Sequence, residues 1–321
     1  MPISLTHLVD RFWALAPDPE GGLGLEATHL AARTLVRAYY LGQLLIAFQH
    51  LALWNHYVGL RSIRPLWPVF WASGDSGRDA MLILLLFAAG SCAAAFFPDH
   101  IAARAAAFFG CLEFSAFVSS FGTVRHVHHL MLLTSFLFVL IPVRSGRAAR
   151  DEDRRAYLRG VWGVQCAALL TYSMAGFVKL MTGAWHLATG QGGVLTPAAM
   201  ALHVANSGIR FGIDAPLADL AIRARILGLP IYLVVLYLEL FALPIAFRPR
   251  LHRPWGVALV LMHLGISLTL NLFFLSSLFI VGLLLLASPF APATPGWRAA
   301  AGELPLLGRF VRRFAPAPAS L

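Results

Sequence analysis

The chain has 321 residues, of which 59% are hydrophobic and 12% charged, and its formal net charge is +10. Soluble domains average about 45–50% apolar and about 25% charged residues, so this composition predicts a polytopic membrane protein and excludes an ordinary soluble domain. The isoelectric point of about 10.4 does not indicate a nucleic-acid partner, because the arginines are scattered through loops and form no basic domain.

The first segment, residues 1–30, contains prolines, acidic residues and a glycine run, but no long apolar core. We therefore expect no cleavable signal peptide and assign this segment to the cytoplasm. The three cysteines, Cys92, Cys111 and Cys166, all fall inside apolar runs, and no C-x-x-C motif occurs. This pattern argues against a disulfide framework and against a cysteine-based zinc site.

Apolar stretches of about 20 residues, the length that a helix needs to cross a bilayer, recur through residues 31–290. We divide one long apolar stretch near Asn271, and we expect residues 291–321 to form a cytoplasmic tail rich in Pro, Ala and Arg. The prediction is an all-α bundle of about eight transmembrane helices, at residues 35–55, 79–97, 101–120, 126–143, 160–181, 228–247, 255–271 and 274–290.

The distribution of arginine predicts the orientation of this bundle. With both termini in the cytoplasm, 17 of the 24 arginines fall on the cytoplasmic side, as the positive-inside rule expects. We therefore predict a multi-pass protein of the bacterial inner membrane. The longest outer connection, residues 183–226, includes a segment with helical character at 197–207 and could fold back over the helix ends.

Lys179 is the only lysine in the chain and lies in an otherwise apolar run. Ionisable groups at membrane depth are costly and usually functional, and a lysine, unlike an arginine, can lose its proton when it is desolvated. Tyr172 and Gly176 precede it by seven and three residues, so all three share one face of a helix. The structural alternative is that Lys179 extends toward the outer membrane interface, as lysines near helix ends often do.

A second polar group, Arg125-His126-Val-His128-His129, begins the predicted helix at 126–143 on the same outer side. His126 and His129 are three residues apart and share a helical face. Metal binding, proton relay and substrate orientation are all possible roles, and contact with lipid headgroups is the structural alternative. No second histidine box exists, so we predict no metal centre.

Other polar residues fall inside or beside the predicted spans. We expect Glu239 and His263, both near mid-membrane on their helices, to neutralise each other in the bundle. Trp185 follows the end of the predicted helix at 160–181 and has the character of an interfacial aromatic belt.

The run Tyr172-Ser-Met-Ala-Gly-Phe-Val-Lys179-Leu, followed by Trp185 and Gly190, resembles a family signature, Y-x-x-[AS]-G-x-x-K-L…W…G. The signature is that of vitamin K-dependent gamma-carboxylase and its bacterial relatives, the HTTM (horizontally transferred transmembrane domain) family. The His128-His129 pair and the Glu239…Pro244…His263-Leu-Gly pattern are also similar to the family and occur in the same order. The resemblance covers about residues 30–290.

This resemblance implies an enzyme that uses a reduced quinone, vitamin K- or menaquinol-like, together with oxygen and carbon dioxide, and no metal. It implies that Lys179 is the base that deprotonates the quinol, assisted by His128 or His129, in a carboxylase- or oxygenase-like reaction. The remaining candidate site residues would contact the quinone or substrate: Tyr172, Gly176, Trp185, His126, His263 and Glu239. The large lumenal domain of the eukaryotic carboxylase has no counterpart in this sequence, which leaves the acceptor open.

Two other functions compete with this one. A non-catalytic accessory or maturation factor would bind a quinone, a lipid or a small peptide partner in the membrane. A proton-coupled transporter would use Glu239, His263 and Lys179 as its proton pathway, although no discontinuous helix pairs or internal repeats are visible. The enzymatic hypothesis places the site toward the outer face. It also requires that the Lys179 amine lie away from both water and a permanent counter-ion.

Overall fold

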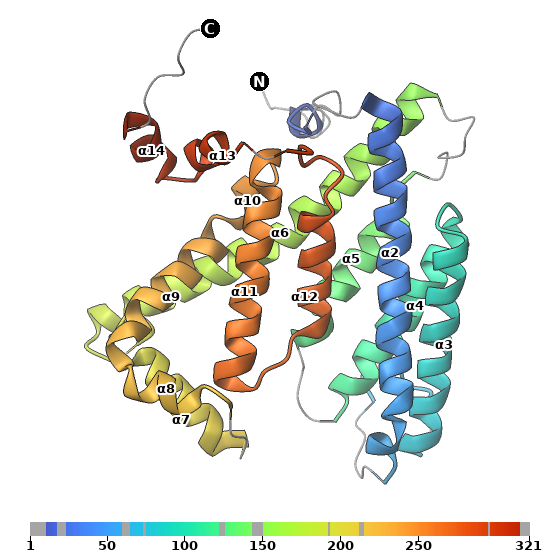
Figure 1. Cartoon of the computed structure of the whole chain (residues 1–321). Coiled ribbons are helices and arrows are strands. Elements are labelled where there is room, and N and C mark those ends of the chain that lie inside the picture. The colour runs from blue at the N-terminus through green and yellow to red at the C-terminus, as the bar shows by residue number, and fades with distance from the viewer. Residues whose placement is uncertain are drawn as a thin grey trace, which may run out of the picture. The chain divides into compact units, whose positions relative to one another are not determined.

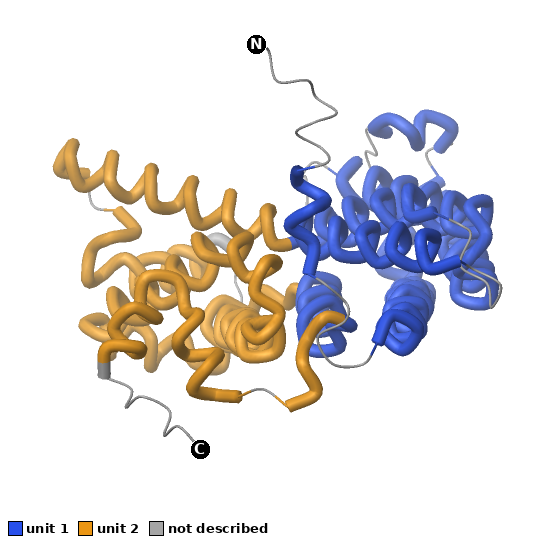
Figure 2. The backbone as a smooth tube through the Cα atoms, turned by 90° about the horizontal axis from the view of Figure 1, so that it is seen from above, with its two compact units in different colours: residues 1–168, 275–289 blue, residues 169–274, 290–321 orange. Residues whose placement is uncertain are grey.

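The computed structural model describes residues 11–17, 24–59, 65–72, 75–121, 126–142, 150–191, 193–211, 215–294 and 296–314. All regular secondary structure in these ranges is helical, which confirms the all-α prediction. Arg125 of the predicted histidine group lies outside the described residues. The chain divides into two compact units, and the division between Ala168 and Leu169 falls within one helix (Figure 2).

Unit 1 comprises residues 1–168 and 275–289. Its helices are labelled in Figure 1, and short 3-10 turns at Trp54–Tyr57 and His126–His128 and a π-helical turn at Gly282–Leu286 supplement them. The helices are α2 (Gly24–Ala52), α3 (Ser76–Phe96), α4 (Ile101–Ser119), α5 (His129–Val139), the first part of α6 (Asp151–Ala188) and α12 (Leu275–Val281).

Unit 2 comprises residues 169–274 and 290–321. It begins with the second part of α6, and a 3-10 turn at Pro249–Leu251 precedes its longest separate helix, α11. Its other helices are α7 (Ala199–Phe211), α8 (Ala218–Arg223), α9 (Arg225–Leu240), α10 (Ala242–Ile245), α11 (His252–Leu270), α13 (Trp297–Glu303) and α14 (Gly308–Phe314).

Four helical segments in the described residues are long and apolar enough to cross a bilayer: α3, α4, α6 and Pro249–Leu270, which contains α11. The chain is therefore a helical membrane protein, but four segments do not support the predicted count of about eight. Three of the four other predicted spans, 126–143, 228–247 and 274–290, fall where apolar sequence forms short or interrupted helices. The fourth, 35–55, lies in α2, which has 29 residues but is not among the segments that are apolar enough. Helix α5 has 11 residues, or about 16 Å, and α9 has 16 residues with Pro230 inside it.

Two predicted boundaries differ from those of the structure. Helix α6 has 38 residues, about 57 Å, and extends beyond the predicted 160–181 at both ends. Trp185 consequently lies within this helix and does not follow it. The predicted division near Asn271 is confirmed, because α11 ends at Leu270 and Asn271 adopts a left-handed conformation (φ 51°) as its C-cap. The predicted helical segment at 197–207 corresponds to α7.

Close helix packing organises unit 1. A Cβ at Gly90 of α3 would lie 2.6 Å from the backbone oxygen of Ala106, and one at Gly110 of α4 would lie 2.6 Å from Cα of Phe87. Only glycine allows the two backbones to approach this closely. In lipid the hydrophobic effect does not drive helices together, so close packing of this kind stabilises their association.

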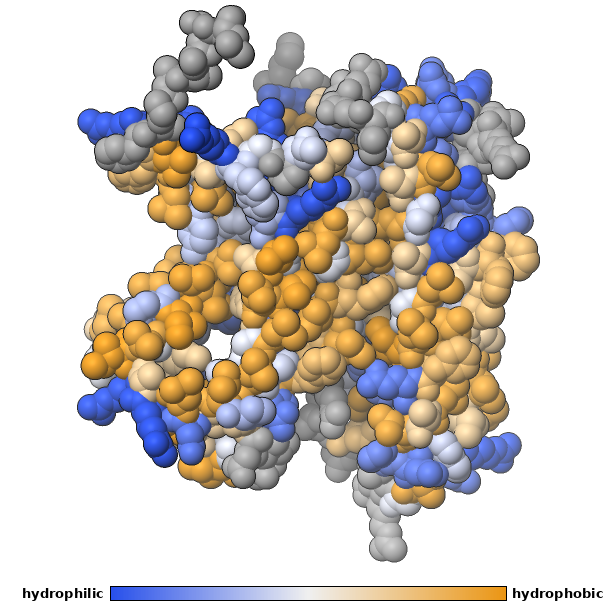
Figure 3. Space-filling view, in the orientation of Figure 1, coloured by the Kyte–Doolittle hydropathy of each residue, from blue (hydrophilic) through white to orange (hydrophobic). Residues whose placement is uncertain are grey.

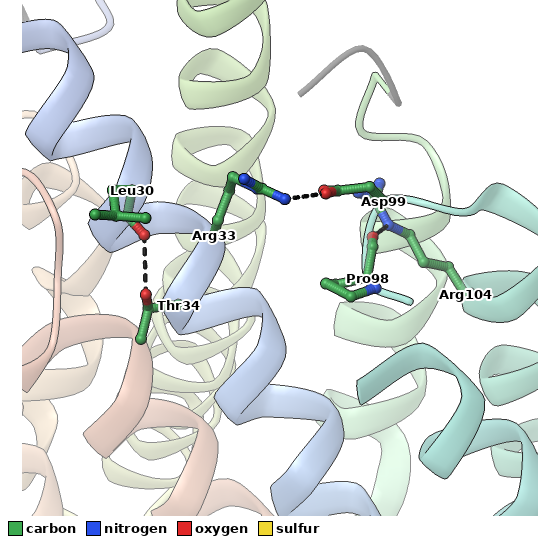
Figure 4. A network of polar contacts seen from close by, with 6 residues as sticks. All are labelled: Leu30, Arg33, Thr34, Pro98, Asp99 and Arg104. Atoms are coloured by element: carbon green, nitrogen blue, oxygen red, sulfur yellow. Dashed lines mark hydrogen bonds and ion pairs between the residues drawn. The ribbon is translucent and has the colours of Figure 1, made fainter. Parts of the chain in front are cut away.

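Polar side chains close one end of unit 1 (Figure 4). Arg33 of α2 pairs with Asp99 in the α3–α4 turn, and the Nε group of Arg104 donates to the carbonyl of Pro98. Arg104 is fully buried, and its Nη1 donates to Phe138 O at 3.1 Å and to Ile141 O at 2.8 Å. These carbonyls lie at the C-terminal end of α5 and just beyond it, so the Arg104 guanidinium caps that helix.

Candidate functional site

Lys179 of α6 and Glu239 of α9 form an ion pair within unit 2. The amine Nζ donates to Glu239 Oε1 at 2.5 Å, and the two side chains are 38% and 6% exposed. The prediction that Lys179 lies away from a counter-ion is therefore wrong. A charge removed from water is stabilised by an opposite charge, and the carboxylate on the neighbouring helix compensates the amine.

One small residue of α6, Gly176, brings these helices together. A Cβ on Gly176 would lie 2.6 Å from the backbone nitrogen of Leu240 and 2.9 Å from Glu239 Cβ, so any larger residue would displace the end of α9. Gly176 thus allows the neighbouring helix to approach closely. Because Gly176 lies three residues before Lys179, this close approach places Glu239 beside the amine.

Ser173 was not predicted from the sequence. Its side chain bonds to backbone groups at the α9–α10 junction, where a proline interrupts the helical hydrogen bonds. Pro244 has no N–H to donate to the carbonyl of Leu240, four residues earlier. The Ser173 hydroxyl donates to Leu240 O at 3.1 Å and accepts from Leu243 N at 2.9 Å. One hydroxyl therefore satisfies a carbonyl and an amide at the junction of α9 and α10. The signal available in the sequence was Pro244, which predicts an unpaired carbonyl at Leu240.

A second polar pair lies two helical turns earlier on α6. Tyr172 Oη and His263 Nε2 of α11 are 2.7 Å apart and form a buried hydrogen bond, and the Phe274 ring is 5.7 Å from the imidazole. The prediction that Glu239 and His263 neutralise each other is therefore wrong. Each pairs with a residue of α6, which reaches both α9 and α11 from one face.

Two buried polar atoms at this face have no hydrogen-bond partner among the described residues: Glu239 Oε2 and His263 Nδ1. A buried polar atom without a partner is unfavourable by about 1–3 kcal/mol, so such atoms usually mark a place for water or a ligand group. Glu239 Oε2 can accept a hydrogen bond from a hydroxyl group. The Lys179 amine beside it is partly exposed, so an incoming group could also contact Nζ.

The side chains of α6 next to Lys179 offer an apolar surface. Phe177, Val178 and Met181 are exposed in the structure, and Trp185 lies exposed farther along the helix. Figure 3 shows hydrophobic residues over the visible surface of α9 and α11, with hydrophilic residues at the helix ends. Lipid chains or an isoprenoid tail would fit this surface, because neither requires hydrogen-bond partners.

The predicted histidines belong to unit 1. His126 and His129 are exposed and share a face as predicted, with their Nδ1 atoms 3.2 Å apart. His128 is buried, with its ring 5.0 Å from Phe114 and 5.8 Å from His50. His50 in turn bonds to Tyr57, with Nδ1 3.2 Å from the hydroxyl.

These histidines belong to unit 1, whereas Lys179 belongs to unit 2. The predicted assistance of Lys179 by His128 or His129 stays a prediction. Among the described side chains, no three His, Cys, Asp or Glu residues gather in a way that could hold a metal ion.

Comparisons with known proteins give no match: no family model, no curated protein and no solved structure is similar to this chain. The resemblance to the HTTM family therefore depends on the motif residues alone.

Proposed function

We propose that this protein is a quinol- and oxygen-dependent membrane enzyme in which Lys179 and Glu239 act together as an acid–base pair. The proposal rests on one observation, an ion pair in an apolar environment whose carboxylate keeps a second, unpartnered oxygen. A reduced quinone would supply the hydroxyl proton and the electrons for oxygen chemistry. The motif resemblance to the HTTM family supports this assignment and leaves the acceptor open.

The ion pair with Glu239 does not meet the requirement that the Lys179 amine lack a counter-ion, so the proposal replaces that requirement. In its place, the paired carboxylate would itself provide a route to a neutral base. A proton that moves along the 2.5 Å contact from Lys179 Nζ to Glu239 Oε1 leaves an uncharged amine and an uncharged acid. A low-dielectric environment favours neutral groups over separated charges. Lys179 Nζ would then accept the proton of one quinol hydroxyl, while Glu239 Oε2 would accept a hydrogen bond from a second donor group of the bound molecule and so orient it.

On the predicted topology, sequence spacing favours a site near the middle of the bilayer, which differs from the outer-face position expected from the sequence. Glu239 precedes Arg248, in the loop assigned to the cytoplasm, by nine residues, which would span about 13 Å if they were helical throughout. Half of a typical hydrocarbon core is about 15 Å. We retain the topology of about eight spans with both termini in the cytoplasm as part of this proposal.

The test is oxidation of a reduced quinone by the purified protein in lipid nanodiscs under oxygen. Lys179→Arg keeps a cation opposite Glu239 but cannot act as a base at neutral pH. We expect the rate to fall at least about 100-fold in this variant, the usual contribution of a general base, with thermal unfolding close to wild type. An unchanged rate of quinol oxidation in the Arg variant would show that Lys179 is not the base.

One observation favours a different function. The ion pair joins α6 to α9 and would have a purely structural role. The protein would then be a non-catalytic membrane factor that binds a quinone, a lipid or a small peptide. Under this alternative the wild-type protein binds reduced quinone without turnover. Quinol oxidation at the background rate in the presence of saturable quinol binding would favour this second function.

A further inference from the structure

The C-terminal helices α13 and α14 enclose a basic hollow beside the loop that begins the Pro249–Leu270 segment. Figure 1 draws α13 beside α10 and α14 on the far side of α13, and the hollow has a volume of about 550 Å³. Its lining includes three arginines, one acid and three large apolar residues: Arg248, Arg309, Arg312, Glu303, Leu304, Leu306 and Phe310.

Several contacts fix the walls of this hollow. A Cβ on Gly308 would lie 2.3 Å from the Gly302 carbonyl oxygen, so the helices can approach only with glycine there. Arg312 donates to the same carbonyl. Tyr237 of α9 donates to Pro305 O at 2.7 Å, and Arg248 donates to Glu303 O at 2.6 Å. The hollow is thereby attached to α9 and to the turn that precedes α11.

The charge of the hollow is unbalanced. The Glu303 carboxylate pairs with Arg250 at 2.8 Å, which neutralises the only acid in the lining. Arg248 and Arg312 donate to carbonyl oxygens, which leave their charges uncompensated. The Arg309 side chain makes neither a hydrogen bond nor an ion pair within the described part of the chain. Guanidinium groups bind phosphate with paired hydrogen bonds, so the hollow is suited to a phosphate-bearing anion.

Two apolar side chains of the lining indicate which kind of molecule carries that phosphate. Leu306 has a left-handed backbone (φ 60°), which is unfavourable for a bulky residue, and its side chain is 66% exposed. Phe310 is 64% exposed. Strained residues commonly mark functional sites. An exposed leucine and phenylalanine beside arginines, at the end of a candidate spanning segment, match the boundary between headgroups and acyl chains.

We propose that this hollow binds the headgroup of an anionic phospholipid, with its phosphate at Arg309, Arg248 and Arg312 and its acyl chains along Leu306 and Phe310. The cytoplasmic leaflet, where the proposed topology places these residues, is rich in anionic lipid. This site is separate from Lys179 and does not depend on the enzymatic proposal.

Native mass spectrometry of the detergent-purified protein tests the proposal, with phosphatidylglycerol, phosphatidylcholine and inorganic phosphate as probes. Arg309→Gln removes a charge from the lining, and Arg313→Gln removes one from the same helix outside it. We expect phosphatidylglycerol to be retained over phosphatidylcholine. We also expect its affinity to fall about fivefold in the Arg309 variant, the effect of roughly one interfacial charge, and to stay unchanged in the Arg313 variant.

Three outcomes would overturn the proposal. Equal retention of both lipids would mean that the phosphate alone, or the apolar surface alone, determines binding. Equal losses in the two variants would mean that general surface charge attracts the lipid. Full displacement of phosphatidylglycerol by millimolar inorganic phosphate would assign the hollow to a free anion. Because both arginines are exposed, both variants should fold normally, and thermal unfolding verifies this.

Discussion

Replacing Lys179 with methionine should destabilise the protein more than replacing its partner Glu239 with glutamine. The methionine variant leaves a carboxylate whose side chain is only 6% exposed without a cation, and breaking a buried pair in this way costs about 3–5 kcal/mol. The lysine is 38% exposed, so we expect the lower end, about 3 kcal/mol. The glutamine variant leaves this more exposed amine beside a polar amide, and we expect about 1 kcal/mol.

The assay is reversible unfolding in mixed micelles with increasing denaturing detergent, applied to the two single variants and the double variant. The double variant removes both charges, so its loss of unfolding free energy should be smaller than that of the methionine variant alone. The difference from additivity measures the coupling between the two groups. Equal losses in the two single variants, or additive losses in the double variant, would refute the reasoning that the buried carboxylate depends on the amine.

Three further predictions concern the contacts that surround this pair, and each is checked by thermal unfolding in detergent. Gly176→Leu should destabilise the protein by about 1–3 kcal/mol, because its Cβ would meet the backbone of Leu240; stability equal to wild type would contradict the close approach. Ser173→Ala should cost about 2 kcal/mol by leaving Leu240 O and Leu243 N unpaired, and a loss below about 0.5 kcal/mol would show that other groups satisfy them. Tyr172→Phe should cost about 1 kcal/mol through the lost bond to His263, whereas an increase in stability would indicate that the bond is not formed.

Local rules predicted some features of this chain correctly. Three-residue spacing brought His126 and His129 onto one face, and a polar residue inside a long apolar stretch located the end of α11 at Asn271. The extent of α6 was missed because its first residues are charged. Acidic side chains such as Asp151 and Glu152 stabilise a helix N-terminus, so the helix continues where hydropathy predicts a loop.

Pairing across the chain could not be predicted in the same way. Lys179 and Glu239 are 60 residues apart, and the sequence did not distinguish Lys179 from His263 as the partner of this carboxylate. Which residue pairs with Glu239 depends on the close approach of α6 and α9, which Gly176 permits. It also depends on the interruption of helical hydrogen bonds at Pro244. Both residues were visible in the sequence, but the helix that each one contacts is a property of the folded chain.

Exchanging the two charges, as Lys179→Glu with Glu239→Lys, separates chemistry from structure most directly. The exchanged pair restores an ion pair between α6 and α9, so unfolding should approach that of wild type. The amine would then lie on α9, away from the position that we assign to the base, and quinol oxidation in nanodiscs should fall to the background rate. A folded, exchanged variant that oxidises quinol at the wild-type rate would contradict the claim that Lys179 is the base.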